Sequence, residues 1–190
     1  MRYIAMSALV AMVTAMCYPN TSTSVAPLDV VVKFCELDAR GMRLSSTTSS
    51  AVTPLVAWEA APGWDSVIVV AGCEASLVSE ADAKAVVDVE YEVLGFIGGY
   101  TWYPMNTDDE TVSPILVNSD RVQMELVRSR STPWQIASPL IRPHVHPEIM
   151  LKRLRRHIGK ELIPQQELMR TIEHLEMLTE SVEGSESVQR

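Results

Sequence analysis

The chain has 190 residues, a length typical of one domain with at most an appended tail. Hydrophobic residues make up 47% of the chain and charged residues 21%, so it is apolar enough to bury a core and is not globally disordered. Sixteen basic and 24 acidic residues give a formal net charge of -8, which repels polyanions and confines any nucleic-acid contact to a local basic surface.

The N-terminal stretch bears on the compartment in which the protein works. Residues 1–17 combine a basic start with an apolar run that is similar to a secretory signal, but residues 14–16 make a poor cleavage site. We predict that this run is part of the core; its composition fits helix and strand equally well, and it is too short to span a membrane. The sequon at Asn20 matters for a secreted chain.

The three cysteines, Cys17, Cys35 and Cys73, are an odd number without a C-x-x-C spacing. This pattern argues against a disulfide framework and against a thiolate zinc site. We therefore expect buried free thiols.

Several segments of the first two thirds of the chain have strand patterns. Apolar and acidic residues alternate over 86–94, which predicts a strand with one solvated face. The β-branched runs at 28–35 and 66–71 predict strands buried on both faces. Weaker strand candidates are 52–58 and 121–127.

Long loops rich in Ser and Thr separate the early strands, at 19–27 and 44–54. Such loops are ordinary in β-sandwiches with Greek-key crossings. We therefore predict a mainly β fold in which residues 1–97 form an antiparallel β-sandwich of the jelly-roll type.

Six prolines fall within residues 98–147, a composition that favours an extended arm over long helices. An arm of this kind is stable when it lies across a neighbouring surface, with aromatic side chains as anchors. We expect the arm to contact other subunits through Trp102, Tyr103 and Trp134.

Residues 148–190 have a helical pattern. One helix is expected from Pro147 to a stop at Gly159, and a second from Ile163-Pro164 to about residue 182. The last eight residues are expected to be a frayed acidic tail. In the second helix, apolar residues at three- and four-residue steps are further candidates for the subunit interface: Leu168, Ile172 and Leu175.

The basic run at 152–160 is the one electrostatic anomaly of the chain. Its five cations, candidates for weak nucleic-acid binding, are Lys152, Arg153, Arg155, Arg156 and Lys160. On a helix several of them would share a face and neutralise phosphates in a salt-sensitive manner. The alternative is a solvated helix face that pairs with the acidic helix that follows it.

The candidate chemical sites are weak. His144 and His146 form an H-x-H pattern, which on a strand places two imidazoles on one side as in cupins, but Glu148 follows at once and a helix begins. The acidic triplet 108–110 lies between prolines and is expected to form a turn rather than a calcium site. We predict no metal, no cofactor and no catalytic residue, because nucleophile, phosphate-binding and zinc motifs are absent from the sequence.

The run VVDVEYEVLGFIGG at 86–99, preceded by short β runs and Ser/Thr loops, resembles the last strand and exit of jelly-roll coat proteins of small icosahedral positive-strand RNA viruses. The opening Met1-Arg2-Tyr3 and the PNTS loop are similar to a mid-barrel strand of picorna-like coats. The resemblance covers about residues 1–105 and has no invariant motif. It implies a structural virion protein that self-assembles into an icosahedral capsid.

The partners implied by this resemblance are further copies of the chain or other capsid subunits, with genomic RNA at the basic helix and no membrane. Its location would be the virion, after assembly in the host cytoplasm. The competing hypothesis is a secreted or periplasmic β-sandwich binding module, which the signal-like start and the sequon favour. An enzyme is the third class, and the sequence offers no set of groups to support it.

Overall fold

The computed structural model describes residues 25–58, 63–104 and 121–186. Predictions for residues 1–17, Asn20 and the acidic triplet 108–110 lie outside these ranges. The described elements, in chain order, are α1 (Pro27–Ala39), the 3-10 helices η1 (Met42–Leu44), η2 (Ser49–Ala51) and η3 (Thr53–Leu55), β1 (Ser66–Glu80), β2 (Lys84–Gly98), β3 (Thr101–Pro104), β4 (Arg121–Val127), β5 (Gln135–Ser138), β6 (His144–Val145), α2 (Pro147–Arg155) and α3 (Gln165–Glu186).

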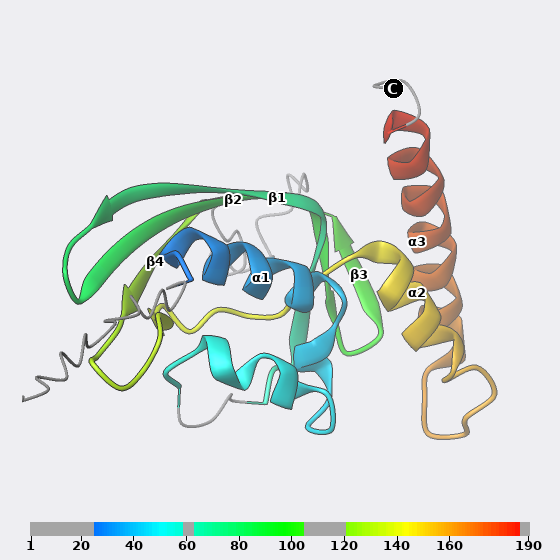
Figure 1. Ribbon diagram of the computed structural model, residues 1–190. Helices are drawn as coiled ribbons and strands as arrows, with labels where there is room; N and C mark the ends of the chain where they lie inside the picture. The colour runs from blue at the N-terminus through cyan, green and yellow to red at the C-terminus, as the bar shows by residue number, and fades with distance from the viewer. Residues whose placement is uncertain (1–24, 59–62, 105–120, 187–190) are drawn as a thin grey trace, which may run out of the picture.

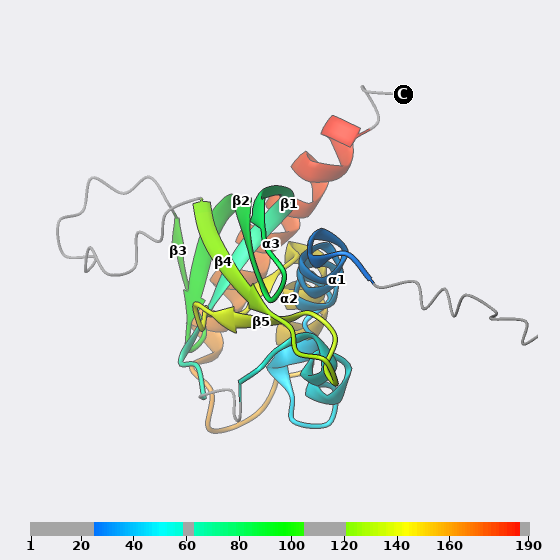
Figure 2. The same ribbon diagram turned by 60° about the vertical axis from the view of Figure 1, so that its left-hand side comes forward.

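The strands form one mixed sheet that curls into a half-barrel (Figure 2). Its order is β5-β4-β2-β1-β6, and β3 pairs with the end of β2 that β4 leaves open. All pairs are antiparallel except β1 with β6. Register shifts interrupt the long β1–β2 hairpin at three places, and shifts of this kind bend and twist a strand pair. The curl of the sheet follows from them.

Three strand predictions are confirmed. The segment 86–94 lies within β2, 66–71 lies within β1, and 121–127 coincides with β4. The alternation in β2 has the expected consequence, because Val87 and Val89 are fully buried while Glu90 is exposed.

The strand prediction for 28–35 is wrong, because this segment lies in α1. Pro27 begins the helix at a position where its missing N–H costs nothing, and Asp29 lies in the first turn. The buried side chains of α1 recur at helical steps: Val30, Val31, Phe34, Cys35 and Asp38. The free energy gained by burying this helix face outweighs the strand propensity of the three consecutive valines.

The weaker strand prediction for 52–58 is also wrong for most of its length. Residues 49–55 form two 3-10 turns, and Val56 makes a single parallel bridge to Ile136. Hydroxyl groups of this segment bond to nearby carbonyl groups instead of leaving them for a sheet ladder; Thr53 Oγ1, for example, donates to Ser49 O at 3.1 Å.

The proline-rich segment does not leave the fold as an arm in its described parts. Residues 101–104, 121–127, 135–138 and 144–145 are strands of the same sheet. Trp134 is 2% exposed and packs within the chain's own core. Pro104 ends β3 and Pro139 directly follows β5. At such positions a missing N–H leaves no ladder bond unmade, so the described parts of the segment are compatible with a sheet.

Two apolar cores cover opposite faces of β1. Ile68 and Val70 belong to a core shared with α1, over which the sheet arches, whereas Val69 between them belongs to a core shared with α2 and α3 (Figure 1). The described residues have about equal strand and helix content, so a β-rich fold is compatible with the structure, but the strands form one sheet with helices on both faces.

The two helices predicted for the C-terminal part are confirmed, but α3 runs to Glu186, so residues 183–186 are helical where a frayed tail was expected. α2 begins at Pro147, and Gly159 adopts a φ of +79° in the turn that precedes α3. Side chains of both helices are buried in the second core, among them Leu154, Leu168 and Leu175. Within the described ranges, no helix is both long enough and apolar enough to cross a membrane.

Candidate functional site

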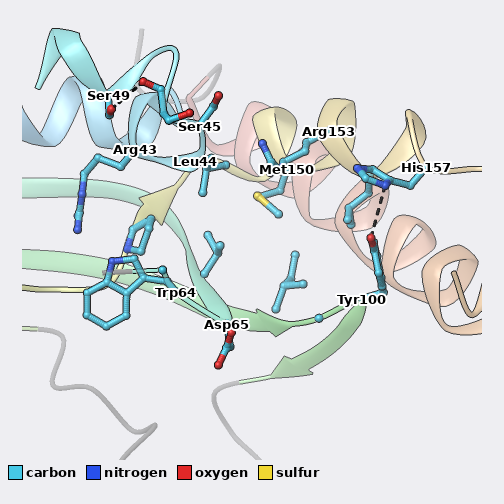
Figure 3. A pocket seen from close by; sticks show the side chains of 17 residues that line it. Arg43, Leu44, Ser45, Ser49, Trp64, Asp65, Tyr100, Met150, Arg153 and His157 are labelled. Carbon is cyan, nitrogen blue, oxygen red and sulfur yellow. Dashed lines mark hydrogen bonds between the residues drawn. The ribbon is translucent and has the colours of Figure 1, made fainter. Parts of the chain in front are cut away.

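An open cleft of about 770 Å³ lies where four distant segments of the chain meet beside Pro143 (Figure 3). Its walls come from the turns at 43–49, the start of β1 at 63–67, the β2–β3 turn at 97–100, and the stretch 150–157 that includes most of α2. A volume of this size is typical of small-molecule sites.

The floor of the cleft is apolar. Val67 and Ile97 are paired neighbours on β1 and β2, and Met150 and Leu154 of α2 pack beside them in the second core. Because this floor belongs to the core, its position is fixed by the fold.

One end of the cleft is formed by Tyr100 and His157. The Tyr100 hydroxyl lies 3.5 Å from His157 Nδ1, and the backbone carbonyl of Tyr100 accepts a 2.7 Å hydrogen bond from Thr171 Oγ1 of α3. Gly99, with a φ of +60°, makes the tight turn that presents Tyr100, and its N–H donates to Asp65 O at 3.2 Å. Partial burial, with the positive charges of Lys160 and Arg153, lowers the pKa of His157.

Arg153 supplies a cation at the rim. It lies one turn before His157 and one turn after Met150, so these three side chains share one face and all line the cleft. Arg153 is exposed, and none of the ion pairs among the described residues includes it. Its guanidinium group is therefore available to an anionic group of a ligand.

Trp64 lines the opposite side of the cleft, at the start of β1. Its indole Nε1 is buried and has no hydrogen-bond partner in the described part of the chain. A buried donor without a partner carries an energetic cost.

Arg43 also lines the cleft, but its guanidinium group is already paired within the chain. Nη1 donates to Asp38 Oδ2 at 3.0 Å and to the carbonyl of Arg142 at 3.3 Å, and Nη2 donates to the carbonyl of Ile141. The guanidinium group also lies 5.5 Å from the ring centroid of Phe34. Arg43 therefore holds the wall together, and Arg153 is the cation that faces outward.

The five cations of the predicted basic run have different surroundings in the structure. Arg155 Nη2 pairs with Glu176 Oε1 of α3 at 2.7 Å, which is the pairing with the acidic helix that the sequence left open as an alternative. Arg153 lines the cleft, and the remaining members are exposed: Lys152, Arg156 and Lys160. A contact of this run with RNA stays a prediction.

The H-x-H pattern does lie partly on a strand, since His144 belongs to β6. His144 is 3% exposed and stacks on Tyr91, with 4.0 Å between ring centroids. No group of three or more metal-ligating side chains is found within the described ranges. The burial of His144 against Tyr91 is consistent with a structural role for this histidine.

Four of the six residues predicted for a subunit interface are buried within the chain. Trp134, Leu168, Ile172 and Leu175 are each at most 3% exposed. Trp102 packs against the second core, and Tyr103 stacks on Phe96 with 4.7 Å between ring centroids. The apolar periodicity does indicate a packing face, but its partner is the chain itself.

Comparison of the chain with protein-family models, with curated proteins and with solved structures finds no match. The function proposed below therefore depends on the geometry of the site.

Sequence reasoning did not find the cleft. Arg153 was noted as one of five cations, but Trp64, Tyr100 and Met150 carry no motif. The cleft exists because the β2–β3 turn and α2 meet beside the start of β1, and this meeting depends on tertiary packing alone.

Proposed function

We propose that this protein is a binding module for a small amphipathic anion, with an aromatic or otherwise apolar body and one carboxylate, sulfonate or phosphate group. The observation that carries the proposal is the cleft that joins an unpaired rim cation, Arg153, to an apolar floor built from the core.

The arrangement of groups matches such a ligand. An apolar body would cover Val67, Ile97 and Met150, which lie at the base of the cleft. An anionic group would meet Arg153 at the rim. The basic residues Lys152 and Arg155 lie beside Arg153 in the last turn of α2, whereas Asp65 is a carboxylate of the lining, so the anionic group is expected on the side of Arg153.

The chemistry at the cleft supports binding without a reaction. Tyr100 and His157 lie close enough to hydrogen bond, but the described lining contains no thiol and no third group that orients the imidazole as a base. We therefore assign these two side chains to ligand contact.

The test uses two fluorescent probes of the same shape, 1-anilinonaphthalene-8-sulfonate and its uncharged analogue N-phenyl-1-naphthylamine. We expect the sulfonate probe to bind the native chain at one site. Arg153→Gln should weaken that binding about tenfold, as expected for the loss of one charge-assisted contact, and leave the uncharged probe unaffected. Added salt should weaken the sulfonate probe alone.

The matched control is Arg156→Gln, which removes the same charge from an exposed residue that does not line the cleft. Near-ultraviolet circular dichroism of each variant must remain native, because the sulfonate probe also binds partly folded chains. Equal weakening by both substitutions, or no saturable binding to the native chain, would contradict the proposal.

The coat-protein hypothesis is the second proposal, and it has less support. Its physical argument was that residues 98–147 need sister chains to cover them, whereas Trp134 and Ile136 are buried by the chain itself. Exposed apolar side chains on and near the C-terminal helices still favour self-association, with Leu162 99% exposed and Met177 58% exposed. A jelly-roll sandwich would require a second sheet from residues outside the described ranges.

Light scattering of the purified protein during size-exclusion chromatography tests this second proposal. Rings or shells would support it, and a monomer across a wide range of concentration would remove it. Secretion, which belongs to the binding-module hypothesis, also stays a prediction. It is tested by N-terminal sequencing of the mature chain, where a start near Met16 or Cys17 would support it.

A further inference from the structure

A second cavity, of about 180 Å³, lies between α1 and β1. Two thiols line it, one from each element. Cys35 of α1 is 2% exposed, and Cys73 of β1 is exposed. The expectation of buried free thiols therefore holds for Cys35 and is wrong for Cys73, while Cys17 lies outside the described residues.

Tyr91 lies beside both cysteines. Its hydroxyl oxygen lies 3.6 Å from Cys35 Sγ, and Tyr91 is the cross-strand neighbour of Cys73 in the β1–β2 register. The Tyr91 ring stacks on the ring of His144, and His146 also lines the cavity. Both cysteines therefore line one small cavity, and Cys73 is the exposed one of the two.

The two thiols differ in acidity because they interact. The neighbouring Cys35 thiol lowers the pKa of Cys73. The Cys73 thiol, together with burial, raises the pKa of Cys35. The thiolate is the nucleophilic form of cysteine, so the exposed member of the pair has the more nucleophilic character and the buried member stays protonated beside it.

We propose that Cys73 and Cys35 form a thiol–disulfide exchange site, in which Cys73 attacks a low-molecular-weight disulfide and Cys35 resolves the product. This site is separate from the amphipathic-anion cleft, with which it shares no lining residue.

The reaction balances in two steps. The Cys73 thiolate attacks one sulfur of the disulfide RSSR, the S–S bond breaks, and one thiolate RS⁻ leaves. Cys35 Sγ then gives its proton to a departing thiolate and attacks Cys73 Sγ, which expels the second RS⁻. Two protein thiols become one disulfide between α1 and β1, and one RSSR is reduced to two RSH.

The experiment treats the full chain with oxidised glutathione, quenches it with acid, and identifies the tryptic peptides by mass spectrometry. The sequence suits such peptide mapping, because cleavage at Lys and Arg places the three cysteines in separate peptides, residues 3–33, 34–40 and 44–84. We expect a disulfide between peptides 34–40 and 44–84, with a transient glutathione adduct on 44–84.

Single substitutions separate the two roles. Cys35→Ser should trap the glutathione adduct on Cys73, and Cys35→Ala repeats this test without a buried hydroxyl group. Cys73→Ser should leave Cys35 without an adduct under the same conditions. Cys17→Ser should behave as the unsubstituted chain does.

Three results would overturn the proposal. The first is a stable adduct on Cys73 in the unsubstituted chain without progress to the Cys35–Cys73 disulfide. The second is a disulfide that includes Cys17. The third compares the rates of glutathione adduct formation in two variants. The proposal is overturned if Cys35 in the Cys73→Ser variant reacts as fast as Cys73 does in the Cys35→Ala variant.

Discussion

Asp38 Oδ2 accepts a 3.0 Å hydrogen bond from Arg43 Nη1 at a place where the two side chains are 0% and 3% exposed. The same oxygen accepts a 3.0 Å hydrogen bond from the backbone N–H of His144. One carboxylate thus connects the end of α1, the turn after it and the parallel strand β6. The wall of the amphipathic-anion cleft that carries Arg43 depends on this connection.

Replacing Asp38 tests the importance of this ion pair. We expect Asp38→Ala to lower the free energy of unfolding by about 3–5 kcal/mol, because it leaves a buried guanidinium group without its counter-charge. The control is Glu36→Ala on the same helix, whose pair with Lys33 is about half exposed and should contribute little to stability. Urea unfolding measures both. Similar small losses for the two variants would show that the buried pair is not a structural anchor.

Gly95 tests the packing of β3 against β2. A Cβ at this position would lie 2.5 Å from Cζ2 of Trp102 and 2.6 Å from the backbone oxygen of Tyr103, and the backbone oxygen cannot move aside easily. We expect Gly95→Ala to destabilise the protein by about 1–3 kcal/mol.

Gly72 on β1 is the matched control for Gly95, because a Cβ there would have no other atom within 4 Å. Gly72→Ala should leave the midpoint of thermal unfolding unchanged or slightly raised. If the two glycine variants unfold at the same temperature, the close approach of Trp102 to β2 is wrong.

His157 predicts a pH dependence of stability. Its pKa is lowered in the folded chain by partial burial and by the charges of Lys160 and Arg153, while Tyr100 faces it from the β2–β3 turn. The unfolded chain, with a histidine pKa near the ordinary 6.5, then binds more protons in the range below that value. The contribution of His157 to the free energy of unfolding is complete above the pKa that this histidine has in the unfolded chain. It is lost as the pH falls through the pKa that it has in the folded chain.

The measurement compares unfolding free energies at about pH 7.5 and about pH 5 for the unsubstituted chain and for His157→Gln. The unsubstituted chain should lose more stability on acidification than the variant does. A variant with the same or a steeper loss would mean that His157 is not held in its neutral form by the fold.

The elements that the sequence predicted well are those in which one local period decides the structure. β2 alternates apolar and acidic residues, and α2 begins at a proline and ends before a glycine with positive φ, so neighbouring residues alone identify them. α1 was mistaken for a strand because its valines favour extended backbone, and its helical face is completed by Phe34 and Asp38 further along.

The prediction of an arm failed for a different reason. Prolines at 104, 133 and 139 indicate where a strand cannot continue, but they do not show which chain the strands between them pair with. Whether Trp134 is buried by its own sheet or by a neighbour depends on contacts between residues far apart in sequence, and composition carries no information on these. The cleft, which four such segments form, could not be predicted for the same reason.

Backbone amide shifts in nuclear magnetic resonance spectra show residue by residue whether the cleft between α2 and the β2–β3 turn binds an amphipathic anion. On titration with 1-anilinonaphthalene-8-sulfonate, we expect the largest shifts at residues that line the cleft: Ser45, Tyr100, Met150 and Arg153. Shifts confined to the distal end of the β1–β2 hairpin or to the exposed face of α3, with these amides unchanged, would contradict it.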